Sequence, residues 1–265
     1  MNETTDVRIE PRGPALWITL NRPQAMNSLN DAIVSGINAA LDEAENNHRL
    51  RAVVLTGAGR AFCAGADLKS VQEMNTTGDP AAALTAFLER VRLMMGRLED
   101  FPLPTILGVN GLTLAGGLEL LLCCDLVVAD ANATIGDGHG KYGLIPGGGA
   151  SARLPRRIGP SRAKYMMYTA RSFAPTELLQ WGLVNEIAPA GQLEATIETL
   201  VASFADKSPL GLRRMKRLLD DSFEQSLDVA LRAEITMSEL HAHSYDRNEG
   251  LTAFNEKRVP VFEGR

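Results

Sequence analysis

Residues 53–68, VVLTGAGRAFCAGADL, decide the fold, because an apolar run gives way there to closely spaced glycines and alanines. Ala52–Thr56 is short, apolar and bounded by glycine, which is typical of a buried parallel strand. Ala61–Asp67 places small residues where a strand meets the start of a helix. A helix N-terminus has unpaired N–H groups and the positive end of the helix dipole, and small residues let a ligand oxygen reach those groups.

Two further segments share this feature. Asn110–Glu119, NGLTLAGGLE, and residues 135–149, IGDGHGKYGLIPGGG, each place small residues before the expected start of a helix. Two N–H donors from different loops that converge on one carbonyl oxygen form an oxyanion hole. Small residues before a helix also serve close packing, so each segment alone has a second interpretation.

Strand and helix patterns alternate along the chain as far as residue 191, which indicates an α/β fold. Further strands are predicted at 15–20, 104–109, 126–129 and 183–187, helices at 29–44, 81–98, 116–124, 161–169 and 175–182, and loops at 57–69 and 134–149. Beyond residue 191 the pattern is purely helical. We therefore predict an α/β core over residues 1–198 and a helical C-terminal region over residues 199–265.

The composition narrows the class of protein. The 265 residues carry a net charge of −5, from 27 basic and 32 acidic side chains, which argues against nucleic acid as a partner. Cys63, Cys123 and Cys124 offer neither a disulfide framework nor metal-site spacing, so we expect a reducing, cytoplasmic environment. The polar N-terminus and the lack of an apolar run of about 20 residues predict no signal segment and no membrane partner. Phe62 breaks the dinucleotide-binding glycine pattern, and no metal site is expected.

Six stretches, in family order along the chain, resemble the crotonase superfamily of enoyl-CoA hydratases and isomerases. They are NRPQAMNSL (21–29), VVLTGAGRAFCAGADL (53–68), VNGLTLAGGLELLLCCD (109–125), GLIPGGG (143–149), GLVNEI (182–187) and AFNEKRVPVF (253–262). The resemblance implies a crotonase-type spiral core of ββα repeats followed by a helical C-terminal trimerisation region. It implies a homotrimer or a dimer of trimers with an acyl-CoA substrate, and no cofactor apart from the coenzyme A of that substrate.

The resemblance also assigns roles to particular positions. It implies that the N–H groups of Ala66 and Gly116 hold the thioester carbonyl, which would stabilise an enolate formed at the α-carbon. Lys257 is either a ligand of the phosphate end of coenzyme A, in this or a neighbouring subunit, or an ordinary solvated lysine. The residues implied to line coenzyme A are Gln24, Ala25, Ala64, Gly65, Asp67 and Leu68.

Glu119 is the first candidate for acid–base chemistry. It lies three residues beyond Gly116, about one helical turn, so it can project towards the same pocket as the oxyanion donors. A first-turn glutamate also complements the helix dipole. However, Leu118 and Leu120 flank it, and burying a carboxylate among leucines would be costly without a role. We therefore predict that Glu119 is catalytic.

His139 occupies the place where hydratases of the superfamily carry a second glutamate, counted back from residues 145–147. Adding water to an α,β-double bond needs one group to deprotonate the water and another to protonate the α-carbon. An imidazole titrates near pH 6.5 and can take either role, so we predict that Glu119 and His139 form the acid/base pair. His139 could instead be a loop residue that donates to a nearby carbonyl. Asp137 is expected either to orient the imidazole or to cap its own loop.

The leading prediction is thus an enoyl-CoA hydratase. A double-bond isomerase is an alternative, because a 1,3-proton shift needs one base, Glu119 or His139. A β-diketone-cleaving branch of the superfamily also has histidine here, but it adds an aspartate in the following turn, where this chain has Gly148.

Non-enzymatic alternatives are an acyl-CoA-binding relic and an RNA-binding protein. The basic residues available for RNA are Arg213, Arg214, Lys216 and Arg217. The residues expected to line either an acyl pocket or the ordinary core are Met74, Phe87, Met94 and Tyr142.

Overall fold

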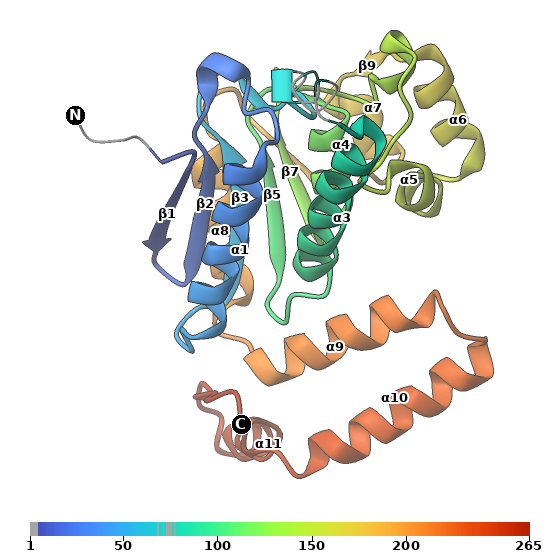
Figure 1. Cartoon of the computed structure of the whole chain (residues 1–265). Coiled ribbons are helices and arrows are strands. Elements are labelled where there is room, and N and C mark those ends of the chain that lie inside the picture. The colour runs from blue at the N-terminus through green and yellow to red at the C-terminus, as the bar shows by residue number, and fades with distance from the viewer. Residues whose placement is uncertain (1–4, 68, 71, 73–75, 77) are drawn as a thin grey trace.

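The computed structural model describes residues 5–67, 69–70, 72, 76 and 78–265. Figure 1 shows a sheet flanked by helices and, beneath it in this view, a separate layer formed by the last helices of the chain. The predicted α/β class is confirmed.

The larger sheet of the described chain has six strands in the order β1-β2-β3-β5-β7-β10. They are Val7–Arg12 (β1), Ala15–Leu20 (β2), Ala52–Gly57 (β3), Thr105–Val109 (β5), Leu126–Asp130 (β7) and Glu186–Ala188 (β10). β1 pairs antiparallel with β2, and the other neighbours are parallel. The carboxyl ends of the parallel strands therefore meet at one edge, where loops from different repeats can build a site.

A second sheet joins the three strands that follow directly on β3, β5 and β7, together with a short strand that follows α6. Its strands, in the order β4-β6-β8-β9, are Ala61–Cys63, Leu112–Leu114, Thr134–Gly136 and Ser172–Phe173. The chain thus passes through β3 and β4, then β5 and β6, then β7 and β8, with helices between the pairs, which is the predicted ββα repeat. The expectation of plain loops at 57–69 and 134–149 was wrong for β4 and β8, because three-residue strands are too short to show a period.

Helices fill the connections and follow the sheets. They are Asp31–Glu45 (α1), Pro80–Glu99 (α3), Gly116–Leu122 (α4), Ala150–Ile158 (α5), Pro160–Thr169 (α6), Pro175–Gln180 (α7), Leu193–Ala205 (α8), Pro209–Ser222 (α9), Leu227–Ala242 (α10) and Tyr245–Glu256 (α11), with 3₁₀ turns at Pro23–Ala25 (η1) and His139–Tyr142 (η2). The side chains of Asn30 and Asp79 cap α1 and α3 by accepting from N–H groups of the first turn. Helix α5 begins directly after residues 135–149, where a helix start was expected, but its extent was not predicted, because Pro155 interrupts its pattern.

Both faces of the larger sheet are covered, and strand β2 shows how. Leu16, Ile18 and Leu20 belong to the apolar cluster that includes α1 and α3, whereas Ala15 and Trp17 belong to the cluster that includes α8. The alternation follows from the two-residue period of a strand. A strand buried on both faces has no polar alternation, which explains why these segments appear in the sequence as continuous apolar runs.

The C-terminal helices stand apart from the core (Figure 1). Helix α8 spans the predicted boundary at residue 198 and packs on β5 and β7, and α9 then begins the separate layer at Pro209. Lys216 of α9 pairs with Asp125 at 2.8 Å and connects that layer to the core. Asp246, which is buried, accepts from Ser208 and from the backbone of the chain's last residues, so it holds the C-terminus against α9. The division of the chain into two domains stays a prediction.

The structure also shows whether the described helices could cross a membrane. Within the described ranges, no helix combines the length and the apolar character needed to cross a bilayer.

Candidate active site

Ala66 presents a backbone N–H to the edge of the sheet. Leu29 N donates to Gly65 O at 2.8 Å, and Asp67 N donates to Leu29 O at 2.9 Å, so Ala66 forms a parallel bridge with Leu29. In such a bridge the bonded groups lie on one side of the chain. The N–H of Ala66 therefore points away from Leu29, and it is free of this pairing.

Gly116 supplies a second N–H, at the first position of α4. The first four N–H groups of a helix have no acceptor within it. The turn before this helix is unusual, because Ala115 has a φ of 48° and a ψ of −113°. Ala115 N donates to Asp137 O at 2.7 Å, so the strained turn is held by the loop after β8.

Glycines let the two backbone segments that carry these N–H groups approach one another closely. Gly65 has a φ of 106°, and a Cβ on Gly65 would lie 2.9 Å from Ala115 Cβ. A Cβ on Gly116 would lie 3.4 Å from Gly65 Cα and 2.9 Å from Leu29 Cδ1. The backbone segments that carry Ala66 and Gly116 thus lie in direct contact, which is the arrangement expected of a two-donor oxyanion hole.

Glu119 is buried, with 4 % of its surface exposed, on the first turn of α4. Gly148 N and Ala150 N donate to its Oε1 at 2.8 and 3.1 Å. Both bonds from described residues end on Oε1, so the carboxylate is fixed through one oxygen while Oε2 takes none of these donors. A buried carboxylate held in this way has a fixed direction.

His139 is held by Asp137, whose side chain is 1 % exposed. Asp137 Oδ1 lies 2.9 Å from His139 Nδ1, and Oδ2 accepts from His139 N at 3.1 Å. Burial lowers the pKa of His139, but the hydrogen bond and charge of Asp137 and the charge of Glu119 outweigh it, so the pKa is raised. The aspartate therefore both shapes its own loop and orients the ring, the two roles that the sequence left open. With Nδ1 engaged, Nε2 is the nitrogen left for chemistry.

The loops implied to line coenzyme A also lie together. Ala64 N donates to Met26 O at 3.1 Å, which places η1, with Gln24 and Ala25, beside Ala64–Asp67. Arg22 Nη2 donates to Asp67 Oδ2 at 2.9 Å.

Asn27 was not singled out from the sequence, yet it connects these loops. It is fully buried with a φ of 54°, and its side-chain amide donates to Ala58 O and Ala61 O. Its side-chain oxygen accepts from Arg22 N at 2.8 Å. Asparagine tolerates this left-handed conformation better than most residues, a requirement that becomes visible only with the backbone in hand.

Two residues predicted to bind coenzyme A, Leu68 and Lys257, are not among the residues that the structure places in these loops. Leu68 lies outside the described residues. Lys257 is exposed at the end of α11, whereas Ala66 and Gly116 lie at the carboxyl edge of the sheet, and Figure 1 shows α11 beyond the opposite edge. Lys257 is therefore not part of the site of its own chain.

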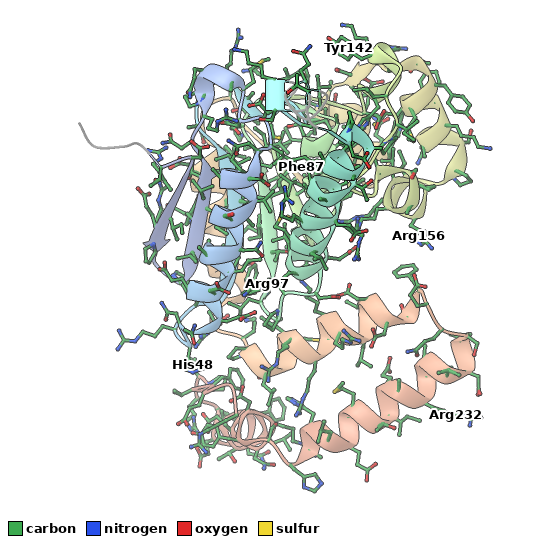
Figure 2. All side chains as sticks on the ribbon, viewed as in Figure 1. His48, Phe87, Arg97, Tyr142, Arg156 and Arg232 are labelled. Atoms are coloured by element: carbon green, nitrogen blue, oxygen red, sulfur yellow. The ribbon has the colours of Figure 1, made fainter. Side chains whose placement is uncertain are left out.

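The residues suggested for an acyl pocket also differ from one another in where they lie. Phe87 and Met94 are buried in the main core, and Figure 2 shows Phe87 between α1 and α3. Tyr142 is 67 % exposed at the outer edge of the loop after β8 (Figure 2), and Met74 lies outside the described residues.

Two buried cysteines lie close in the chain to the candidate site residues. Burial raises the pKa of Cys63 and of Cys123 to about 12, so both remain thiols near neutral pH. Cys123 Sγ donates to Glu119 O at 3.2 Å, a packing role on α4. Across the described ranges, no three His, Cys, Asp or Glu side chains are grouped so as to hold a metal ion.

Comparison with known proteins decides the family. The family model described as enoyl-CoA hydratase/isomerase matches residues 13–265. The chain belongs to this family. The 2,3-dehydroadipyl-CoA hydratase of Escherichia coli is 38 % identical over 94 % of this chain and 95 % of its own length. The short-chain-enoyl-CoA hydratase of Clostridium acetobutylicum is 32 % identical over 99 % of this chain and all of its own length.

Solved structures of the enoyl-CoA hydratase/isomerase family agree. The crystal structure of an enoyl-CoA hydratase from Bacillus anthracis matches with a TM-score of 0.92 and 34 % identity, and it covers 98 % of this chain and 100 % of that one. The predicted crotonase-type fold is thereby confirmed, and the chain is an enzyme of this family.

The first prediction concerns the space around Glu119. A Cβ at Gly148 would lie 2.7 Å from Glu119 Oε2 and 2.9 Å from Met95 Sδ, so Gly148→Ala should destabilise the fold by about 1–3 kcal/mol. Gly96→Ala is the matched control, because Gly96 lies within α3 with nothing within 4 Å of its Cβ position, and it should stabilise by about 0.5–1 kcal/mol. Urea unfolding measures both. Equal effects would contradict the placement of Glu119 against Gly148.

The second prediction concerns pH. Because the folded-state pKa of His139 lies above its ordinary value of 6.5, the ion pair with Asp137 contributes stability that is fully present below about pH 6.5. That contribution is lost as the pH rises through the folded-state pKa. The stability difference between the wild type and Asp137→Asn, measured by urea unfolding from about pH 5 to about pH 9, should therefore shrink with rising pH. A difference that grows with pH would contradict it.

Proposed function

We propose that this chain is an enoyl-CoA hydratase, which adds water across the 2,3-double bond of an acyl-CoA thioester. The observation that carries the proposal is the contact between the backbone segments of two open N–H groups, on Ala66 and Gly116, with Glu119 one turn further along the same helix. The hydratases of E. coli and C. acetobutylicum named above support it. The reaction needs no separate cofactor, because coenzyme A is part of the substrate.

The two N–H groups would act on the thioester oxygen. Negative charge develops on this oxygen when a nucleophile attacks the β-carbon and the double-bond electrons move towards the carbonyl. Donors fixed in advance stabilise that charge without reorganising, and the loss of one such donor typically raises a barrier by about 3–4 kcal/mol.

Glu119 would be the base that takes a proton from water. Gly148 N and Ala150 N hold its Oε1, and its Oε2 would accept the proton as the water oxygen bonds to the β-carbon. His139 would be the acid, because its raised pKa favours the imidazolium. As the enolate collapses, the Nε2 proton of His139 moves to the α-carbon. Exchange with solvent then restores both groups, and the net change is one water added.

The coenzyme A part would lie along the loops that carry Gln24, Ala25 and Ala64–Asp67. Backbone groups there face the edge of the sheet, and the Arg22–Asp67 ion pair stiffens the loop next to the oxyanion donor Ala66. Lys257 would serve the phosphate end in a neighbouring copy, since it ends α11, which lies beyond the opposite edge of the sheet from Ala66 and Gly116 (Figure 1).

The isomerase alternative differs in its demand for catalytic groups. A 1,3-proton shift uses one base, so the second group would be dispensable. The β-diketone hydrolase alternative has less support, because Gly148 carries no carboxylate. A side chain there would also meet Glu119 Oε2 at 2.7 Å.

A homotrimer, or a dimer of trimers, fits the C-terminal layer. Every residue of α10 lies at least partly in solvent, and Leu227 and Ile235 are 76 % and 71 % exposed. Figure 2 shows α10 on the outside of the chain, with Arg232 pointing away from α9. An amphipathic helix with this much uncovered apolar surface favours burial against another copy.

The third prediction tests the reaction. Wild-type protein with crotonyl-CoA should consume the conjugated thioester, followed by its absorbance, and yield 3-hydroxybutyryl-CoA. Glu119→Gln should lower kcat by about 10²- to 10⁴-fold, and His139→Ala by at least about tenfold, because each removes a proton-transfer group. His139→Glu should retain part of the rate, and wild-type kcat should fall as the pH rises through the pKa of His139.

Outcomes of this experiment separate the alternatives. No turnover with short, medium or aromatic enoyl-CoAs would contradict the hydratase proposal, and coenzyme A binding without turnover would favour a relic. A product with a shifted double bond, formed at full rate by either Glu119→Gln or His139→Ala, would identify an isomerase. If neither His139 variant changed kcat tenfold, His139 would have only a structural role.

The fourth prediction tests the assembly. Light scattering on a sizing column should give three or six chains for the wild type. Ile235→Glu should lower that number, because it places a charge on the apolar side of α10. Arg8→Ala, on the exposed side of the edge strand β1, is the control and should leave the assembly unchanged. A monomeric wild type would contradict the proposed assembly.

A further inference from the structure

Arg153 of α5 donates a hydrogen bond to the carbonyl oxygen of Gly148, the residue whose N–H holds Glu119. Its Nη1 donates to Gly148 O at 2.9 Å, while Gly148 N donates to Glu119 Oε1 at 2.8 Å. The side chain of Arg153 is 22 % exposed, so the bond to Gly148 is largely shielded from water. Gly148 is thus fixed from both sides, by the candidate base and by the guanidinium.

Glu99 holds the guanidinium in place. It is the last residue of α3, and its carboxylate accepts from Arg153 Nε at 3.0 Å and from Nη2 at 2.6 Å. Two parallel bonds of this kind fix the plane of the guanidinium as well as its position. The hydrogen bond to Glu99 is the main cause that raises the pKa of Arg153, and the charge of Glu119 acts in the same direction.

The loop has the shape that this contact requires. Gly149 has a φ of 111°, and a Cβ there would overlap Arg153 Nη1. A residue with a side chain could therefore not stand between the guanidinium and Gly148. Met95, also on α3, packs against the Cβ position of Gly148, so the loop is enclosed by α3 and α5.

We propose that Arg153, fixed by Glu99, is a positioning residue for Glu119 that acts through Gly148. It touches neither substrate nor the reacting atoms. It sets the direction in which Gly148 N–H points, and that N–H sets the rotation of the Glu119 carboxylate about its buried side chain. The inference rests on the proposed role of Glu119 as the base.

The fifth prediction follows. Arg153→Lys keeps the charge but loses the planar fork, so Glu119 should be misplaced although the local charge is unchanged. Displacements of about 1 Å at a reacting group can cost about 100-fold in rate, and we expect a loss of kcat between about tenfold and 100-fold with KM nearly unchanged. Glu99→Gln should give a smaller loss in the same direction. Arg156→Lys is the control, because Arg156 lies on the same helix with its side chain 62 % exposed.

A double-mutant cycle separates positioning from general destabilisation. If Arg153 acts through Glu119, Arg153→Lys should cost less than about threefold in a Glu119→Gln background, where no carboxylate remains to be placed. The same full loss in both backgrounds would overturn the positioning role, and so would a loss confined to KM. Thermal unfolding of every variant shows which of them are folded at the assay temperature.

A readout that needs no turnover keeps this inference distinct from the hydratase proposal. Deuterium exchange into the peptide that covers residues 147–152 reports on Gly148 N–H and Ala150 N–H, which bond to Glu119. Exchange there should rise in Arg153→Lys and not in Arg156→Lys. Unchanged exchange would overturn the inference even for an active enzyme, whereas increased exchange in a protein without enoyl-CoA turnover would count against the hydratase proposal alone.

Discussion

The candidate site depends on one steric constraint, the contact between the backbones of Gly65 and Gly116. A Cβ on Gly65 would lie 2.9 Å from Ala115 Cβ, and a Cβ on Gly116 would lie 3.4 Å from Gly65 Cα, so glycine at both positions lets the two segments approach closely. The contact places the second sheet, the start of α4 and the bridge to Leu29 in one fixed arrangement. Under the proposed function, the N–H groups of Ala66 and Gly116 would be held in place before the substrate binds, which is the condition under which such donors lower a barrier.

The length of a sequence pattern determines which parts of the fold and of the candidate site could be predicted from it. The buried strands, such as 52–57, and the long helices, such as α1, were predictable. Burial gives them a regular arrangement of apolar residues over many positions. Glu119 was identifiable in the sequence as a candidate because a carboxylate among leucines conflicts with its surroundings, and the structure shows that it is buried. Strands β4 and β8 were not, because their three residues are too few to carry a period.

The polar contacts that support the candidate site could not be predicted from the sequence, for a different reason. Arg153 reaches Glu99 across 54 positions and Arg22 reaches Asp67 across 45, and both arginines look like ordinary surface residues in the sequence. Asn27 stands out only through its left-handed backbone and its buried amide. Such long-range polar contacts leave no periodic trace, so they become visible only when the backbone is known.

A largely buried histidine at position 139 needs a negatively charged partner to act as a proton donor, whereas a glutamic acid there would not. A glutamic acid becomes a proton donor near neutral pH when burial disfavours its charge, but burial acts on an imidazole in the opposite direction and drives its proton away. His139 is largely buried, so a proton-donating role needs a fixed negative partner. Asp137 is that partner: it is 1 % exposed, bonded to Nδ1, and connected through its own carbonyl to Ala115, the residue before Gly116. The exchange of glutamate for histidine is therefore chemically coherent only as part of a pair, with the aspartate two residues earlier.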